Sequence, residues 1–180
     1  MTLLVRHAES EWNVHFGLHR VDPGIPDPSL TAEGLRQAEV LAASLDDAPI
    51  ARVLTSPYRR ALQTAGVIAA RLSLPVEVEP LVRERCAFSC DQGSHPGELA
   101  REWPHLDFSM LEPRWWGGLI ESMESFAARC ALFRERLAAR QDRHDLLIVT
   151  HWGFIRGLTG QEVHNATVVR LEDATPLIEA

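Results

Sequence analysis

Two arginines and two histidines follow short apolar runs of the sequence, and their types suit the binding and transfer of a phosphoryl group. Arg6 and His7 end the run 3–5, while Arg60 and His151 come after two further runs of this kind. Arginine offers a fixed positive charge and a fork of donors that matches phosphate or carboxylate oxygens. Histidine can serve as nucleophile, general acid, general base or metal ligand. Taken alone, the pair Arg6-His7 is equally consistent with two solvated side chains at the end of a strand.

A pocket in which all four of these side chains meet would require an anion, because their positive charges repel one another. The chain carries a net charge of −7, so bulk charge gives no other reason for a cationic cluster. A phosphoryl group can accept hydrogen bonds from several such donors at once. The sequence contains no glycine-rich phosphate loop of the Walker type, which disfavours a nucleotide hydrolase.

Phosphoryl transfer in such a pocket needs a nucleophile and a proton donor. A neutral imidazole nitrogen of His7 can attack phosphorus in line, while its other ring nitrogen bonds a backbone carbonyl that fixes the tautomer. Glu84 is the best placed acid, because it lies in an irregular segment just beyond an apolar run. A carboxyl group near a phosphate dianion holds its proton more tightly, which suits protonation of the leaving alkoxide. The same group can then activate the water that cleaves the phosphohistidine.

The elements that must position these residues alternate between strands and helices. The predicted strands are 1–6, 53–55, 75–79, 146–150 and 168–171, with 75–79 at an edge because it begins with proline. The predicted helices are 32–45 with Thr31 as N-cap, 57–72 with Ser56 as N-cap, about 97–103, 122–140 and 152–158. Glycines and prolines in 14–30 predict a long loop instead.

This alternation predicts an α/β fold in which a mostly parallel central sheet has helices on both faces, a three-layer sandwich. We expect one domain over residues 1–180, since no linker divides the chain. In such sheets ligands bind beyond the carboxyl ends of the strands. Arg6 with His7, Arg59 with Arg60, and His151 would therefore meet at one edge, with Arg59 as a solvated helix residue.

Composition bounds the class of protein. A chain of 180 residues with 46% hydrophobic and 24% charged residues suits one globular domain. The net charge of −7 and the pI near 5.6 disfavour binding to nucleic acid or to an anionic membrane. No apolar run approaches the roughly 20 residues of a spanning helix, and the N-terminal run is too short for a signal peptide. We therefore expect a cytoplasmic protein, and three cysteines do not make a disulfide framework.

Five blocks of the chain resemble, in order, the motifs of the histidine phosphatase superfamily, which is also called phosphoglycerate-mutase-like. The blocks are Arg6-His7-Ala8-Glu9-Ser10 with Asn13, Leu30-Thr31-Ala32-Glu33-Gly34 with Gln37-Ala38, Ser56-Pro57-Tyr58-Arg59-Arg60-Ala61-Leu62-Gln63-Thr64-Ala65, Leu81-Val82-Arg83-Glu84, and Val149-Thr150-His151-Trp152-Gly153-Phe154-Ile155-Arg156. Each block alone is a weak signal, but five in the family's order are specific and span nearly the whole chain.

The resemblance implies a phosphoric monoester hydrolase of the histidine acid phosphatase type that acts on a small phosphorylated molecule. It implies that His7 is the phosphorylated nucleophile and Glu84 the proton donor. The residues that it places around the phosphate are Arg6, Asn13, Arg60 and His151. It implies no metal and no other cofactor, and we expect a monomer or a homodimer.

Two other functions stay open beside hydrolysis. A cofactor-dependent mutase of the same family would return the phosphoryl group to a second hydroxyl of its substrate. Such mutases carry a longer insertion after the acid, whereas here only 85–121 is available, which favours hydrolysis. The other alternative is a non-catalytic phosphate-binding domain of the same fold, although the intact Arg6, His7, Arg60 and His151 disfavour it.

Several residues keep two interpretations. Glu84 can instead be a surface carboxylate, with Glu9 or Glu11 as the acid, and Asn13 can simply begin a helix. Trp152 stands where the family usually has glycine, and either packs on the sheet or narrows the pocket. A metal site is a minor alternative for four residues of one segment, Cys86, Cys90, Asp91 and His95, because their spacing is wider than zinc sites prefer. The substrate is expected to contact 14–28 and 85–121.

Overall fold

The computed structural model describes residues 1–172 and is organised around a five-stranded sheet with the order β3-β2-β4-β1-β5. The strands are β1 (Thr2–Arg6), β2 (Arg52–Thr55), β3 (Val76–Val78), β4 (Leu146–Thr150) and β5 (Val168–Leu171). All neighbouring pairs are parallel except β1 with β5, which is antiparallel at the edge. The predicted α/β class with a mostly parallel sheet is confirmed. The end of the predicted domain, 173–180, lies outside the described residues.

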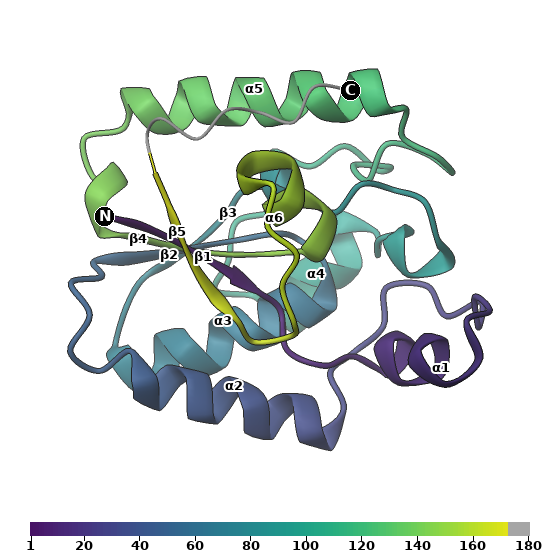
Figure 1. Ribbon diagram of the computed structural model, residues 1–180, viewed down its shortest axis with the longest axis horizontal. Helices are drawn as coiled ribbons and strands as arrows, with labels where there is room; N and C mark the ends of the chain where they lie inside the picture. The colour runs from purple at the N-terminus through teal and green to yellow at the C-terminus, as the bar shows by residue number, and fades with distance from the viewer. Residues whose placement is uncertain (173–180) are drawn as a thin grey trace.

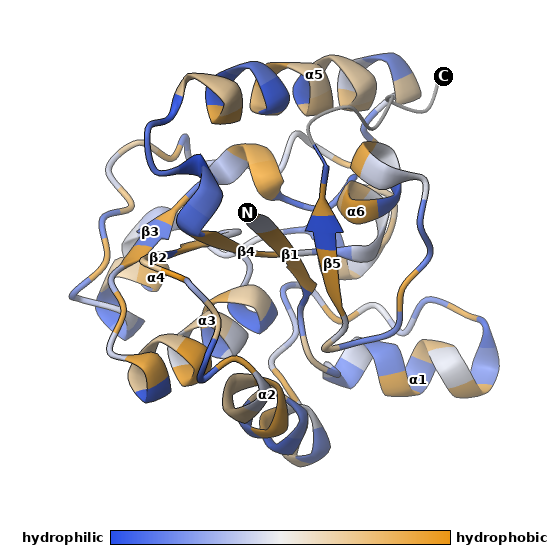
Figure 2. Ribbon diagram, turned by 60° about the vertical axis from the view of Figure 1, so that its left-hand side comes forward, coloured by the Kyte–Doolittle hydropathy of each residue, from blue (hydrophilic) through white to orange (hydrophobic). Residues whose placement is uncertain are grey.

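Helices cover both faces of this sheet and make three layers (Figure 1). Helices α2 (Ala32–Ser44) and α3 (Arg59–Leu72) lie on one face, and α5 (Met123–Ala139) and α6 (Trp152–Thr159) lie on the other. The central strands β1 and β4 are continuous apolar runs because both of their faces are buried. Figure 2 shows these strands in the hydrophobic colour, between helices that carry both hydrophobic and hydrophilic residues. Leu4 and Ile148 pack toward α5 and α6, whereas Val5 and Val149 pack toward α2 and α3.

The remaining helices are short and lie near the ends of the sheet. They are α1 (Glu11–His19), α4 (Pro96–Glu102), and the 3-10 turns η1 (Pro80–Val82), η2 (Ser89–Asp91) and η3 (Arg143–Asp145). None of the helices within residues 1–172 has the length and apolar character needed to cross a membrane.

Helix α1 corrects the prediction of a loop from residue 14 onward. Ser10 caps the helix, and its side chain and that of Asn13 satisfy each other's backbone N–H groups in a capping box. Trp12 stacks on Phe16 one turn later, with ring centroids 4.4 Å apart. This local order outweighs the unfavourable Gly17, and the helix ends only at Arg20, which adopts a left-handed conformation with φ 56°.

The start of α3 corrects a second prediction, because Ser56 is not its N-cap and Pro57 lies outside the helix. The helix begins at Arg59, and Tyr58 in the cap position makes no side-chain capping bond. Instead the distant carboxylate of Asp27 accepts the Arg59 N–H at 2.9 Å. The Ser56 hydroxyl is directed to His151 at 2.8 Å. The predicted cap of α2 is confirmed, since the Thr31 side chain accepts from Gly34 N–H.

Candidate active site

His7 directly follows the last residue of β1, and hydrogen bonds fix both its backbone and its ring. Its N–H donates to Thr150 O at 2.9 Å, and its own carbonyl accepts from the Asn165 amide at 3.0 Å. The ring nitrogen Nδ1 lies 2.7 Å from Ala8 O. Because a carbonyl can only accept, this contact places the proton on Nδ1 and leaves the lone pair on Nε2. The predicted carbonyl contact that fixes the tautomer is therefore present.

The His7 ring is neutral in this environment. The side chain is buried, and the loss of hydration holds the pKa of His7 well below its ordinary value. The nearby positive charges of Arg60 and Arg6 lower this pKa further. A neutral imidazole with a free Nε2 lone pair is the form that can act as a nucleophile.

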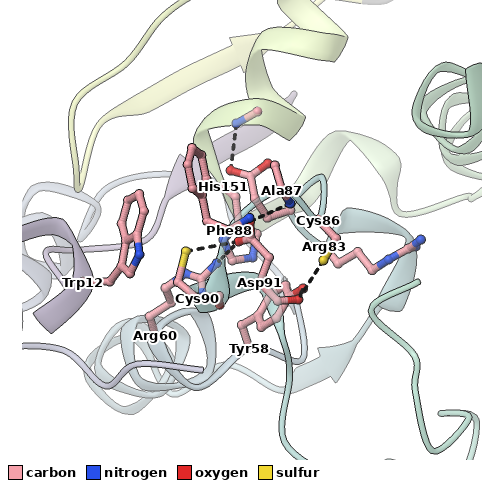
Figure 3. A network of polar contacts seen from close by, with 12 residues as sticks. Trp12, Tyr58, Arg60, Arg83, Cys86, Ala87, Phe88, Cys90, Asp91 and His151 are labelled. Carbon is pink, nitrogen blue, oxygen red and sulfur yellow. Dashed lines mark hydrogen bonds and ion pairs between the residues drawn. The ribbon is translucent and has the colours of Figure 1, made fainter. Parts of the chain in front are cut away.

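Arg60, from the first turn of α3, is directed at the same nitrogen. Its Nε lies 3.3 Å from His7 Nε2, and its two terminal nitrogens donate to Cys90 O at 2.7 Å and to the Asp91 carboxylate at 3.1 Å (Figure 3). The guanidinium also lies 4.4 Å over the Tyr58 ring. Arg60 and Asp91 are both almost fully buried, so this ion pair fixes the guanidinium in one orientation.

Asp91 is a site residue that the sequence interpretation did not assign to the phosphate pocket. Its second carboxylate oxygen accepts the N–H groups of Ala87 and Phe88, both at 3.1 Å. The carboxylate therefore connects Arg60 to the segment that follows Glu84. No residue pattern around Asp91 marks it, because it lies in a single 3-10 turn within an irregular segment.

Arg6 and His151 complete the cluster at the carboxyl ends of β1 and β4. Arg6 donates to Val163 O at 2.7 Å, and its buried Nε has no hydrogen-bond partner among the described residues. The rings of His7 and His151 have centroids 5.1 Å apart. His151 is fully buried and is not among the residues that line the active-site cavity, and its Nδ1 likewise lacks a partner among residues 1–172. Burial, and then the charge of Arg60, hold the pKa of His151 well below its ordinary value.

Glu84 lies in the same pocket, which excludes a purely surface position. Its two carboxyl oxygens accept the N–H groups of Arg85 at 2.8 Å and of Gly153 at 2.9 Å. Burial raises the pKa of Glu84, and the negative charge of Asp91 raises it further, while the two N–H groups oppose the shift. A carboxyl group with a raised pKa can hold a proton for transfer to a leaving group.

A buried network from α5 supports the backbone around Glu84. The Arg129 guanidinium donates to the carbonyls of Leu81 at 2.7 Å, Arg83 at 2.8 Å and Glu84 at 3.3 Å. Glu121 pairs with Arg129 at 2.5 Å and neutralises its charge. The position of the acid therefore depends on a residue of α5 that lies 45 positions further along the chain, which no local sequence pattern indicates.

Asn13 has a structural role and also reaches the pocket. Its side-chain oxygen accepts from Ser10 N–H at 3.0 Å in the capping box and from the Asn165 amide at 3.1 Å. Asn13 therefore stands in the first turn of a helix, as one interpretation of the sequence had it, and it also lines the cavity, while its contact with a phosphate stays a prediction.

These residues surround a cavity of about 790 Å³. Arg6, His7, Arg60 and Glu84 are among its lining residues, and most of the others come from α1, the segment after Glu84, α5 and α6. Trp152 also lines the cavity and lies 5.2 Å below the Arg156 guanidinium. Two segments, 14–28 and 85–121, were predicted to contact the substrate, and each lines the cavity only in part. The first contributes Phe16, Gly17 and Arg20, and the second contributes residues within 85–91.

Other residues considered from the sequence lie elsewhere or have other partners. Arg59 pairs with Asp27 and Glu102 outside the cavity. His95 caps α4, where its Nδ1 accepts from Gly97 N–H at 3.1 Å. Within residues 1–172, no three His, Cys, Asp or Glu side chains are grouped as ligands for a metal ion.

Comparison with known proteins shows the family of the chain. The family model of the histidine phosphatase superfamily, branch 1, matches residues 2–172. The chain is 32% identical over 159 residues to the adenosylcobalamin/alpha-ribazole phosphatase of Salmonella typhi, an alignment that covers 84% of this chain and 74% of that protein. It is 33% identical over 158 residues to phosphoserine phosphatase 1 of Hydrogenobacter thermophilus, with 83% and 69% covered.

The fold agrees as well. The solved structure of the alpha-ribazole phosphatase from Shigella flexneri superposes with a TM-score of 0.65 at 27% identity, over 93% of this chain and 87% of that one. The resemblance carried by the five sequence motifs is thereby confirmed over all of the described residues. The chain belongs to the histidine phosphatase superfamily, branch 1.

Proposed function

We propose that this protein hydrolyses phosphomonoesters of small molecules through a covalent phosphohistidine at His7. The observation that carries the proposal is the 2.7 Å contact of Nδ1 with Ala8 O, which leaves the Nε2 lone pair facing Arg60 in the cavity. Both curated relatives described above are named phosphatases, which supports hydrolysis over a mutase reaction.

In the first step, His7 Nε2 attacks phosphorus in line, so that a P–N bond forms as the P–O ester bond breaks. Glu84 gives its proton to the departing oxygen, and the raised pKa of its carboxyl group supports this role. In the second step, Glu84 takes a proton from water as the water oxygen attacks phosphorus, the P–N bond to His7 breaks, and inorganic phosphate is released. His7 returns to its neutral form, and no metal or cofactor takes part.

The phosphoryl oxygens would be held by the cationic cluster. Arg60 offers Nε in place of its contact with His7, and the unpartnered Nε of Arg6 supports a second contact. The unpartnered Nδ1 of His151 supports a third contact at the bottom of the site. The Asn13 amide nitrogen makes no hydrogen bond within residues 1–172 and can donate to the phosphate, while its oxygen accepts in the capping box. Such donors stabilise the charge of the transition state.

The setting that we propose is a cytoplasmic phosphatase of the histidine acid type, acting as a monomer or homodimer on a small molecule rather than a nucleic acid. The three buried free thiols, Cys86, Cys90 and Cys130, favour a reducing compartment. The net charge of −7 disfavours nucleic acid.

Trapping of the intermediate tests this proposal. The protein would be mixed with p-nitrophenyl phosphate, quenched in alkali within milliseconds, and digested to find the phosphorylated residue, since a phosphohistidine P–N bond survives alkali and breaks in acid. We expect phosphate on His7 and release of inorganic phosphate. The variant His7→Asn should lose both signals, by at least about 10³-fold in rate.

The matched control is His15→Asn, which changes an exposed histidine of α1 outside the cavity and should leave both signals intact. Phosphate that remains on the protein in His7→Asn, or turnover without any acid-labile phosphate in the native protein, would contradict the proposed mechanism. Transfer of phosphate to a second hydroxyl of the substrate, without release, would instead indicate a mutase.

A further inference from the structure

Three aromatic rings make one wall of the active-site cavity, next to the phosphate end. Trp12 and Phe16 stack nearly parallel, with an angle of 12° and centroids 4.4 Å apart. Phe88 lies against both, at 5.2 Å from Trp12 and 5.4 Å from Phe16. All three line the cavity, and Figure 3 shows the ring of Trp12 beside that of Phe88. The mechanism proposed above uses none of these rings.

This aromatic wall is fixed by polar contacts on its outer side. The indole N–H of Trp12 donates to Asp22 at 2.9 Å, and the same carboxylate accepts from Ser89 N–H at 2.8 Å. Asp22 therefore joins α1 to the segment that carries Phe88, and these hydrogen bonds lower its pKa to about 2 despite partial desolvation. These hydrogen bonds and the contacts between the rings hold the rings in place, so ordering them costs little when a substrate binds.

Phe88 shows that the wall is available to a ligand. Its side chain is 43% exposed, although a phenyl ring normally gains free energy from burial. Trp12, in contrast, is 9% exposed, and its ring packs against those of Phe16 and Phe88. An aromatic ring left open next to a catalytic cavity is a surface on which a substrate group can stack.

The opposite wall of the cavity is also apolar. It is contributed by α5 and α6 through Met123, Phe126, Ala127, Cys130 and Gly157. The gap between the two walls leads to His7 and Glu84, where the ester oxygen would lie. A phosphoryl group fills only a small part of a cavity of about 790 Å³, so the remainder is available to the leaving group.

Apart from the residues at the phosphate end, the charged and histidine side chains that line the cavity are Arg20, Arg85, Arg156 and His164. Arg20, Arg156 and His164 are exposed, and Arg156 is engaged by Glu162 at 3.6 Å and by the Trp152 ring. The Arg85 guanidinium donates to Glu121 O at 3.1 Å. A small polar leaving group such as an amino acid would therefore meet apolar walls on both sides and few side chains that suit its charges.

We propose that the substrate of this phosphatase is a phosphomonoester whose alcohol carries a flat aromatic group, which stacks between Phe88 with Phe16 on one side and the apolar wall of α5 and α6 on the other. This inference rests on the proposed function, because the stacked group is the leaving group of the His7 reaction. The aromatic wall selects the substrate and takes no part in bond breaking.

A set of alkyl phosphates with leaving groups of similar acidity separates binding from chemistry. Ethyl phosphate, 2-phenylethyl phosphate, 2-cyclohexylethyl phosphate and O-phosphoserine would be compared by kcat/KM from phosphate release. We expect 2-phenylethyl phosphate to exceed ethyl phosphate and O-phosphoserine by about tenfold or more, as expected for burial of a phenyl group. It should exceed the cyclohexyl compound by about threefold, because only the aromatic ring gains from stacking.

The double variant Phe16→Leu/Phe88→Leu keeps the wall apolar but removes two rings. We expect kcat/KM for 2-phenylethyl phosphate to fall by about three- to tenfold, mainly through KM, with ethyl phosphate changed less than about twofold. Leu18→Ala is the matched control, since Leu18 is an exposed apolar residue of α1 outside the cavity. It should leave all four substrates unchanged.

The outcomes distinguish a failure of the aromatic inference from a failure of the proposed phosphatase function. Equal kcat/KM for the phenyl and cyclohexyl compounds, or faster turnover of O-phosphoserine, would overturn the aromatic inference while leaving the phosphatase intact. An equal loss on ethyl and 2-phenylethyl phosphate in the double variant would also overturn it, since the rings would then support the fold or the chemistry. No release of phosphate from these compounds or from p-nitrophenyl phosphate would contradict the proposed function itself.

Discussion

Glu84 shows how a single side chain is positioned by residues that are distant in the sequence. One oxygen accepts from its neighbour Arg85, and the other accepts from Gly153 at the start of α6. Gly153 is required there because a Cβ at this position would lie 2.3 Å from Glu84 Oε1. Gly153, two residues after the second histidine, thus makes room for the proposed acid. This contact links two of the sequence motifs.

The substitution Gly153→Ala should therefore displace the acid while leaving the fold in place, since a carboxyl group can rotate away from the added methyl. We expect kcat on ethyl phosphate to fall by about 10²-fold, which is typical for the loss of a general acid. The rate constant of the first step with p-nitrophenyl phosphate should fall much less, because p-nitrophenolate leaves without a proton. Single-turnover kinetics on both substrates measure this difference.

Gly66→Ala serves as the control for that variant, because nothing lies within 4 Å of an added Cβ in the middle of α3. It should retain the native kcat on both substrates. If Gly153→Ala slowed both substrates in the first step to the same degree, the methyl group would be acting on phosphate binding and not on Glu84.

At the scale of elements, α2 is fixed against the catalytic segment through another glycine. A Cβ on Gly34 would lie 2.0 Å from the backbone oxygen of Glu9, two residues after His7. Thr31, the N-cap of α2, donates its hydroxyl to the Glu9 carboxylate at 2.7 Å. The second sequence block therefore holds the backbone that follows the proposed nucleophile, and contributes no side chain to the cavity lining.

We expect Gly34→Ala to lower the free energy of unfolding by about 1–3 kcal/mol, because the backbone of Glu9 or the start of α2 must shift to admit the methyl group. Urea unfolding followed by circular dichroism measures the change. Gly66→Ala, in the adjacent helix, has free space and should raise stability by about 0.5–1 kcal/mol. Equal stability of the two variants would show that α2 can move away from Glu9 at no cost.

The elements also show what the sequence could not supply. Buried strands and amphipathic helices were predictable because the pattern of their residues follows from the layer that they occupy. Strand β4 is a continuous apolar run, and the buried residues of α5 recur at helical spacing. Helix α1 was missed because glycine and proline in 14–30 obscured its capping box. Ser56 was assigned as a cap on local grounds, whereas the actual acceptor is Asp27, 32 residues away in sequence. Contacts of this range have no local signal.

At the scale of the whole molecule, the convergence of the site follows from the order of the strands. Because β1 and β4 are adjacent and parallel, Arg6 and His151 leave the sheet at the same edge, as their positions after apolar runs predicted. Asp91 and Asn165 could not be predicted in this way, since neither follows a strand of the parallel sheet. Glu84, which no strand delivers either, was predicted because it follows an apolar run and belongs to one of the five family motifs, whereas Asp91 and Asn165 carry neither signal.

Burial of this site also affects the stability of the whole protein. The pKa values of His7 and His151 are held well below their ordinary value, chiefly by burial. In the unfolded chain the same groups take up a proton as the pH falls through about 6.5. The unfolded state then binds more protons than the folded state, so the free energy of unfolding decreases as the pH is lowered.

Between pH 7.5 and 5.5 each buried neutral histidine should lower the free energy of unfolding by roughly 1 kcal/mol. The variant His151→Asn removes one of them, so its stability should fall by roughly 1 kcal/mol less than that of the native protein over this range, even if it is less stable at pH 7.5. His15→Asn, at an exposed position of α1, should keep the native pH dependence. Urea unfolding at five pH values measures the slopes. Identical slopes for His151→Asn and the native protein would mean that His151 becomes protonated in the folded state, which would contradict a neutral pair of histidines at the bottom of the site.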